Sequence, residues 1–181
     1  MSSQRGQSGR VLYVITCATP AARDIGTLVS LAQASGWTVC VIATPSALRF
    51  IDKPSLEAQT GYPVRSEYKQ PGTPDVLPPA DAMVVGGASF NTINKWAAGI
   101  SDTLAVGLLA EAIGLGPPLA ALPFLNADQT EHPVTRPPGA HQLRSRHGHY
   151  RSRAGTYPMW LTRMMTSWGL SISVGPTAYT V

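Results

Sequence analysis

The stretch RVLYVITCATPAARDIGTLVSLAQASGWTVCVIAT, residues 10–44, has the pattern of one β-α-β unit. Its two ends, RVLYVITCA and WTVCVIAT, are continuous apolar and β-branched runs, which are typical of strands buried on both faces. Between them, apolar residues recur at helical spacing until Gly36, a residue that often ends a helix. Because parallel neighbours need a crossover connection of this kind, the stretch predicts two strands of a parallel sheet.

The same alternation of strands and helices continues along the chain. PSALRFID begins a second helix, and DAMVVGG predicts a third strand after the proline-rich loop of residues 70–80. NTINKWAAG and SDTLAVGLLAEAIG predict two helical pieces hinged near Gly99, and PPLAALPFLN predicts a short fourth strand. We therefore expect one α/β domain over residues 11–131, a Rossmann-like (flavodoxin-like) three-layer sandwich with a parallel sheet flanked by helices.

The composition is that of a globular chain able to bury a core. It has 181 residues, 44% hydrophobic residues and a mean hydropathy of +0.02. No apolar run approaches the roughly 20 residues of a membrane-spanning helix, and the polar tail of residues 1–10 has no apolar signal region. We therefore expect a cytoplasmic protein that binds neither membrane nor nucleic acid. Cys17 and Cys40 fall in or beside apolar strand runs, which predicts reduced core thiols.

The C-terminal segment differs in charge from the rest of the chain. Residues 1–131 contain eight Lys and Arg against ten Asp and Glu, a net charge of −2, whereas residues 132–181 contain six Arg and no acid, a net charge of +6. All four histidines also lie in residues 132–181. This basic segment has no sustained period, so we expect it to be partly disordered or to close over a substrate, facing either solvent or an anionic partner.

Each predicted strand is followed by a short stretch of small and polar residues: TCATPAAR, ATPSALRF, GGASFNT and PFLNADQT. The carboxyl ends of parallel strands meet at one edge of the sheet, where hydroxyl and amide groups suit a phosphate and a polar ring. Helix capping is the alternative explanation for Thr44, Ser46, Ser89 and Asn91. The chain has no GxGxxG, GxxxxGK[ST], CxxC or HExxH motif, so dinucleotide, nucleoside triphosphate and metal sites lack support.

The stretch ASFNTINKWAAGISDTL, residues 88–104, resembles the signature of the homo-oligomeric flavin-containing cysteine decarboxylases. That signature is Pro-Ala-Ser-Ala-Asn-Thr, followed by an Ile-x-Lys helix and a Gly-Ile-x-Asp turn, and residues 87–92 fall on its first six positions. Cys-Ala-Thr at residues 17–19 and Thr-Pro-Ser before Phe-Ile in residues 44–51 are further matches. The similarity covers residues 10 to about 135 and is closest to the epidermin-type peptidyl-cysteine decarboxylases.

The resemblance implies FMN as the cofactor and assigns residues to it. The loop after the third strand is expected to wrap the flavin, and the ends of the first two strands are expected to hold the phosphate. The expected cofactor-binding residues are Thr19, Ala21, Thr44, Ser46, Phe50, Gly87, Ala88, Ser89, Asn91 and Thr92. The expected catalytic residues are Asn91, Asn126 and Arg65, with Asn91 reaching between flavin and substrate.

The chain departs from the family pattern at several positions. Gly87 replaces the proline of the signature, and Phe90 replaces a small residue and adds an apolar wall. The second family motif, Pro-x-Met-Asn-x-x-Met-Trp, matches at Pro123, Leu125 and Asn126, whereas Gln129 and Thr130 stand where Met and Trp are expected. In the C-terminal segment, the short AGTYP of residues 154–158 resembles the substrate-clamping hairpin of the family.

Arg65 takes the position of the family's catalytic histidine, with Glu67 two residues on, and no histidine precedes His132. A guanidinium stays protonated at neutral pH, so it cannot accept a proton there. We therefore expect Arg65 to hold a thiolate or a carboxylate.

The resemblance implies oxidative decarboxylation of the C-terminal cysteine of a ribosomally made precursor peptide, giving an enethiol for a 2-aminovinyl-cysteine ring. Oxidation of the cysteine at Cβ gives a thioaldehyde that eases the loss of CO2, and the cofactor carries this step. The alternatives are a phosphopantothenoylcysteine decarboxylase, a flavin-binding scaffold protein without turnover and, more distantly, a flavin prenyltransferase. The family also implies a homo-oligomer, a trimer or a dodecamer, with the flavin at a subunit contact.

Overall fold

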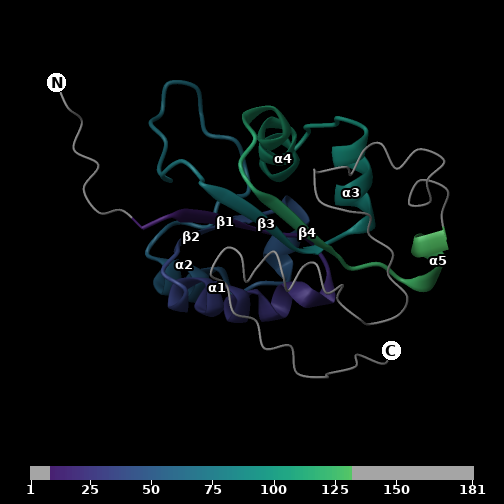
Figure 1. Cartoon of the computed structure of the whole chain (residues 1–181), viewed down its shortest axis with the longest axis horizontal. Helices are drawn as coiled ribbons and strands as arrows, with labels where there is room; N and C mark the ends of the chain where they lie inside the picture. The colour runs from purple at the N-terminus through teal and green to yellow at the C-terminus, as the bar shows by residue number, and fades with distance from the viewer. Residues whose placement is uncertain (1–8, 132–181) are drawn as a thin grey trace. The chain divides into compact units, whose positions relative to one another are not determined.

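The computed structural model describes residues 9–131, which contain a four-stranded parallel sheet (Figure 1). Its order is β2-β1-β3-β4, so the first strand of the chain lies inside the sheet and pairs with β2 on one side and β3 on the other. This arrangement confirms the predicted parallel sheet. The strands are β1 (Val11–Thr16), β2 (Thr38–Ala43), β3 (Ala82–Ala88) and β4 (Leu119–Pro123).

Helices cover both faces of the sheet and complete the predicted three layers (Figure 1). On one face lie α1 (Ile25–Ala34) and α2 (Lys53–Thr60), and on the other lie α3 (Phe90–Ala97) and α4 (Leu104–Leu115). The predicted hinge near Gly99 is confirmed, because Gly99 has a φ of 71° between α3 and α4.

Two predicted helix starts have a tighter form in the structure. The 3₁₀ helices η1 (Pro20–Asp24) and η2 (Pro45–Arg49) follow β1 and β2, each with a proline in its first turn. The α-helix after η2 begins only at Lys53, where the side chain of Asp52 accepts a hydrogen bond from the Ser55 N–H. Proline suits a first turn, so TPAAR and TPSAL begin helical structure without being α-helical themselves.

The core is built from the continuous apolar runs that identified the strands. Every residue of β1 and β3 is buried, and so is all of β2 except its first residue. Cys17 and Cys40 are buried free thiols, which confirms that they do not form a disulfide. Burial on both faces of the sheet is what parallel strands between two helical layers require.

The chain divides into two compact units, residues 1–124 and residues 125–181. The described part of the second unit contains a short helix, α5 (Ala127–Glu131). The expectations for the N-terminal tail, the basic segment and the clamp at residues 154–158 concern residues 1–8 and 132–181, which lie outside the described residues. Between residues 9 and 131, no helix is long and apolar enough to cross a membrane.

Candidate functional site

The carboxyl ends of the parallel strands form one edge of the sheet, and their loops are joined by hydrogen bonds. The Thr44 N–H donates to the carbonyl of Thr16 at 2.9 Å, which joins the end of β2 to the end of β1. The Phe124 N–H donates to the carbonyl of Ala88 at 2.9 Å, which joins the end of β4 to the end of β3. The structure therefore brings the strand-end stretches of the first unit together, as ligand sites in such sheets require.

Gly87 brings the ends of β1 and β3 into direct contact. The pairing of β3 with β4 becomes irregular between Val85 and Ala88, and Gly87 has a φ of 72°. A Cβ at Gly87 would lie 2.6 Å from Thr19 Oγ1 and 2.9 Å from Ala21 Cβ, and the Thr19 hydroxyl donates to the Gly87 carbonyl at 3.2 Å. Only glycine combines this backbone conformation with this closeness, so the departure from the family's proline has a structural reason.

Ser89 and Thr92 form the beginning of α3. Ser89 is the N-cap, its Oγ accepts a hydrogen bond from the Thr92 N–H at 3.3 Å, and it lies 3.0 Å from Thr92 Oγ1. Helix capping therefore accounts for the Ser89 hydroxyl at this position. The Cys17 thiol lies against both residues, and burial raises its pKa, while hydrogen bonds from Thr92 and Ser89 act in the opposite direction. Cys17 thus stays a neutral thiol at neutral pH and is not an activated nucleophile.

Asn91 is exposed in the first turn of α3, so its amide is available to a ligand. One turn further on, Lys95 pairs with Asp102, and the Ile100 N–H donates to the Lys95 carbonyl at 2.8 Å. The Lys and Asp of the family signature therefore bind each other and close the turn between α3 and α4. This contact fixes the helix that carries Asn91.

Thr44 differs from Ser89 although both occupy N-cap positions. The backbone of Thr44 is extended before η2, but its side chain makes no cap hydrogen bond. Ser46 is exposed in the first turn of η2, and Phe50 is half-buried directly after it. Capping therefore does not explain Thr44, whose hydroxyl lies at the carboxyl edge.

Arg65 lies at the outer side of β2. Its backbone forms a parallel bridge to Ile42, and its guanidinium donates to the Glu67 carbonyl at 2.9 Å. Three inter-strand spacings, roughly 14 Å in total, separate this position from β3. The structure therefore does not bring Arg65 into direct contact with the group around Asn91.

Asn126 belongs to the second compact unit. Its Oδ1 accepts a hydrogen bond from the Gln129 N–H at 2.8 Å, and its own N–H donates to Gln129 Oε1 at 3.2 Å. These reciprocal bonds cap α5. Gln129, which stands where the family motif has Met, is thus the partner of Asn126.

Comparison with known proteins places the chain in a family. The model of the Flavoprotein family matches residues 1–148. The chain belongs to this family. Among curated proteins, none matches the chain. Membership confirms the predicted relationship at the level of family and fold, and it supports FMN as the cofactor of this flavoprotein.

Three solved structures illustrate the fold of the family. The FMN-dependent cysteine decarboxylase TvaF from thioviridamide biosynthesis is 21% identical, with a TM-score of 0.62 over 72% of this chain and 81% of that chain. A PPC decarboxylase mutant with bound pantothenoylaminoethenethiol is 24% identical, with a TM-score of 0.57 over 71% and 74%. An EpiD variant complexed with the substrate peptide DSYTC is 22% identical, with a TM-score of 0.59 over 71% and 72%.

The carboxyl edge of this flavoprotein fits a flavin by its own geometry. Gly87 lets the ends of β1 and β3 meet, because Thr19 and Ala21 occupy the space that a Cβ there would need, and Ala21 and Ala88 are small. The Thr44 hydroxyl makes no cap bond, and in the first turns of η1 and η2 the N–H groups of Ala21 and Ser46 follow prolines and have no backbone partner within the turn. The donor set matches a phosphate and a heteroaromatic ring.

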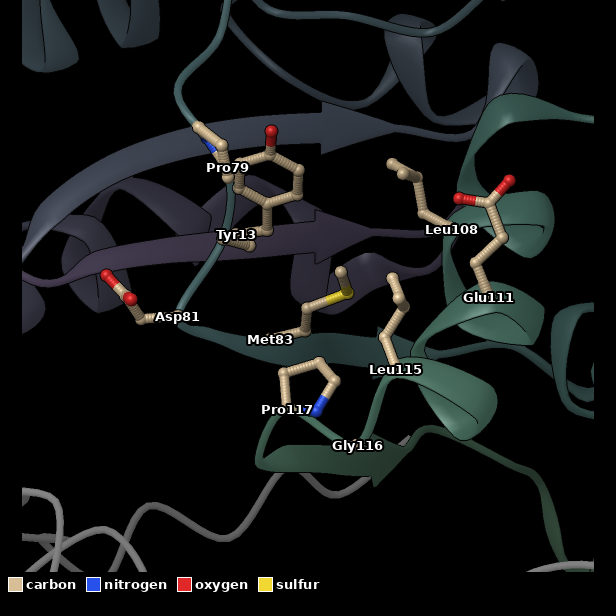
Figure 2. A pocket seen from close by; sticks show the side chains of 10 residues that line it. Tyr13, Pro79, Asp81, Met83, Leu108, Glu111, Leu115, Gly116 and Pro117 are labelled. Carbon is tan, nitrogen blue, oxygen red and sulfur yellow. The ribbon is translucent and has the colours of Figure 1, made fainter.

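A cavity of about 540 Å³ lies at the opposite, amino edge of the sheet (Figure 2). The side chains of Tyr13, Met83, Leu108 and Leu115 face it, and its charged lining residues are Asp81 and Glu111 (Figure 2). The Tyr13 hydroxyl donates to the Pro78 carbonyl at 2.8 Å, and burial raises the pKa of Tyr13 to about 12. Two carboxylates and no basic residue do not suit a phosphate, so the flavin site is not assigned to this cavity.

Proposed function

We propose that this flavoprotein is an FMN-dependent decarboxylase that acts on the C-terminal cysteine of a precursor peptide. The observation that carries the proposal is the carboxyl edge, where Gly87 lets the ends of β1 and β3 meet and Asn91 presents an exposed amide in the first turn of α3. TvaF, named as an FMN-dependent cysteine decarboxylase, and EpiD, bound to a peptide that ends in cysteine, support the reaction class.

We assign the phosphate to the loops after β1 and β2, and the flavin ring to the loop after β3. The hydroxyls of Thr44 and Ser46 and the N–H of Ala21 would hold the phosphate between β1 and β2. Thr19, whose hydroxyl donates to the Gly87 carbonyl, would hold this loop against β3. The loop after β3, with Ala88 and the Ser89–Thr92 turn, would hold the ring, and Phe50 would wall the site. We further propose that the functional unit is a homo-oligomer, a trimer or a dodecamer.

FMN, when bound, supplies the two-electron oxidation of the terminal cysteine. Two hydrogens leave the cysteine, the carboxylate leaves as CO2, and the peptide ends in an enethiol. The chain's own contribution is to position the substrate. The Asn91 amide donates to the carboxylate and accepts from the neighbouring peptide N–H, which a carboxylic side chain at this position could not do.

Arg65 would act on a different group of the substrate from Asn91, because the sheet separates the two residues. We propose that its guanidinium stabilises the substrate thiolate. The histidine-free sequence before His132 favours one other candidate, a flavin-binding scaffold without turnover.

The test uses the purified full-length protein. The bound chromophore is released by heat and identified by mass, and the protein is then incubated with a peptide ending in cysteine and a matched peptide ending in serine. We expect FMN, and the loss of CO2 and two hydrogens from the cysteine peptide only. Recovery of FAD or of no flavin would overturn the proposal. FMN without turnover would support the scaffold, and turnover of phosphopantothenoylcysteine alone would support the small-molecule decarboxylase.

Asn91→Asp tests the proposed substrate contact. A carboxylate there repels the substrate carboxylate and removes the amide donor, so we expect turnover to fall by about 5- to 150-fold, the equivalent of about 1 to 3 kcal/mol. Ala98→Asp, which adds the same charge at the exposed far end of α3, is the matched control. Equal rates for the two variants would leave Asn91 without a substrate role.

A further inference from the structure

Tyr68 connects the segment that carries Arg65 to the turn between α3 and α4. Its hydroxyl lies 3.2 Å from the carbonyl oxygens of both Ser101 and Thr103. A Cβ at Gly107 of α4 would lie 2.0 Å from Tyr68 Oη and 3.0 Å from Cζ. The tyrosine ring thus occupies the space that a side chain at Gly107 would need.

Each of the two segments that Tyr68 joins also contains a contact to a residue next to the proposed site. On one side, the carbonyl of Glu67, the residue before Tyr68, accepts the guanidinium of Arg65, whose backbone is fixed to β2. In the other segment, Asp102 is the residue between Ser101 and Thr103, whose carbonyls Tyr68 contacts. Asp102 pairs with Lys95, which lies one helical turn after Asn91.

We propose that Tyr68 is a positioning residue that fixes Arg65 relative to Asn91, and so sets the spacing of the two groups that hold the substrate. The inference rests on the proposed function, since it assumes that both residues contact the substrate. Tyr68 is itself 51% exposed, so its hydroxyl and the Gly107 contact are what hold the ring in place. Residues 69–76, which follow it, are all exposed.

Two glycines of α4 provide a matched pair for the test. Alanine is the better helix former at both Gly107 and Gly114, so both substitutions have the same intrinsic effect on the helix. They differ in surroundings, because nothing lies within 4 Å of a Cβ at Gly114, whereas Tyr68 fills that space at Gly107. Gly107→Ala therefore displaces Tyr68, and Gly114→Ala does not.

The first readout is independent of activity. Trypsin cleaves after Lys69, directly beyond Tyr68, at a rate that rises when the segment is released. In the FMN-loaded full chain we expect Gly107→Ala to be cleaved about tenfold faster than the wild type, and Gly114→Ala at the wild-type rate. Tyr68→Phe, which removes only the hydroxyl contacts, is the milder second variant and should increase cleavage by a smaller factor. Unchanged cleavage in both Gly107→Ala and Tyr68→Phe would overturn the proposal.

The second readout is kcat/KM for a cysteine-ending peptide, together with flavin content. We expect Gly107→Ala to lower kcat/KM about tenfold with flavin content unchanged, and we expect no further loss when it is combined with Arg65→Ala. A merely structural contact would lower activity equally in both backgrounds, which would overturn the positioning role. An inactive wild type would overturn the proposed function itself. Faster cleavage with unchanged kcat/KM in Gly107→Ala would overturn the positioning role alone.

Discussion

The carboxyl and amino edges of the same sheet offer a ligand very different surroundings. The amino edge has a cavity of about 540 Å³ with apolar walls and two carboxylates. The carboxyl edge has a glycine with positive φ, small side chains, hydroxyls and an exposed amide. Carboxylates repel a phosphate, whereas hydroxyls, an amide and backbone N–H groups suit a phosphate and a flavin ring. The polar groups lining each edge, and not the presence of a cavity, therefore carry the proposed assignment of the cofactor site.

Gly87→Ala against Gly116→Ala is the strongest test of this comparison. Both glycines have positive φ, but Gly87 is crowded at the carboxyl edge and Gly116 has nothing within 4 Å at the amino edge. Backbone strain costs about 1 to 2 kcal/mol at either site, and overpacking adds about 1 to 3 kcal/mol at Gly87 only. We expect Gly87→Ala to lose flavin absorbance and more unfolding free energy in denaturant titrations. If Gly116→Ala loses as much flavin, the two edges do not differ as described.

Arg65→Ala should have the next largest effect. Loss of a charge-assisted contact of about 1.5 to 3 kcal/mol predicts a 10- to 150-fold fall in peptide turnover with flavin retained. Arg65→His should restore part of the rate, with a new titration at about pH 6 to 7, where an imidazole changes charge. Arg49→Ala, an exposed arginine at the end of η2, is the control. Turnover that is equal in Arg65→Ala and Arg49→Ala would make Arg65 a surface residue.

Ser89→Ala measures how much Ser89 stabilises the carboxyl edge as a helix cap, apart from its proposed contact with the ring. Ser89 caps α3 through the Thr92 N–H, so its removal should cost about 1 kcal/mol of unfolding free energy even without flavin. Thr103→Ala removes an N-cap side chain that makes no cap hydrogen bond, and should cost less. Thermal unfolding of the flavin-free proteins measures both. A larger loss in Thr103→Ala would contradict the assigned caps.

Glu111→Gln at the amino edge should have the smallest effect. The residue is exposed beside the cavity, and such substitutions usually change the free energy of unfolding by less than about 0.5 kcal/mol. We also expect unchanged flavin content and peptide turnover. A marked loss of flavin in this variant would indicate that the cofactor binds at the amino edge instead.

The sequence predicted the strands and the α3–α4 break because each has a strong local signal. Continuous apolar runs mark β1 to β3, and Gly99 marks the hinge. The placement of Arg65 at the outer side of β2 had no such signal, because the path of the long segment between α2 and β3 depends on contacts far apart in sequence. The cavity and the contact of Tyr68 with Gly107 were missed for the same reason, since both join separate elements across the fold.

The interior position of β1 also affects how the chain is made. A ribosome releases β1 and β2 first, and they can pair at once, but the other side of β1 has no partner until β3 emerges. The interval from Ala43 to Ala82 is 39 residues, which at about 5 to 20 residues per second corresponds to about 2 to 8 seconds of synthesis. During that time an apolar strand edge is open to other nascent chains. Shortening the proline-rich segment would shorten this exposure, and the yield of soluble protein would report it.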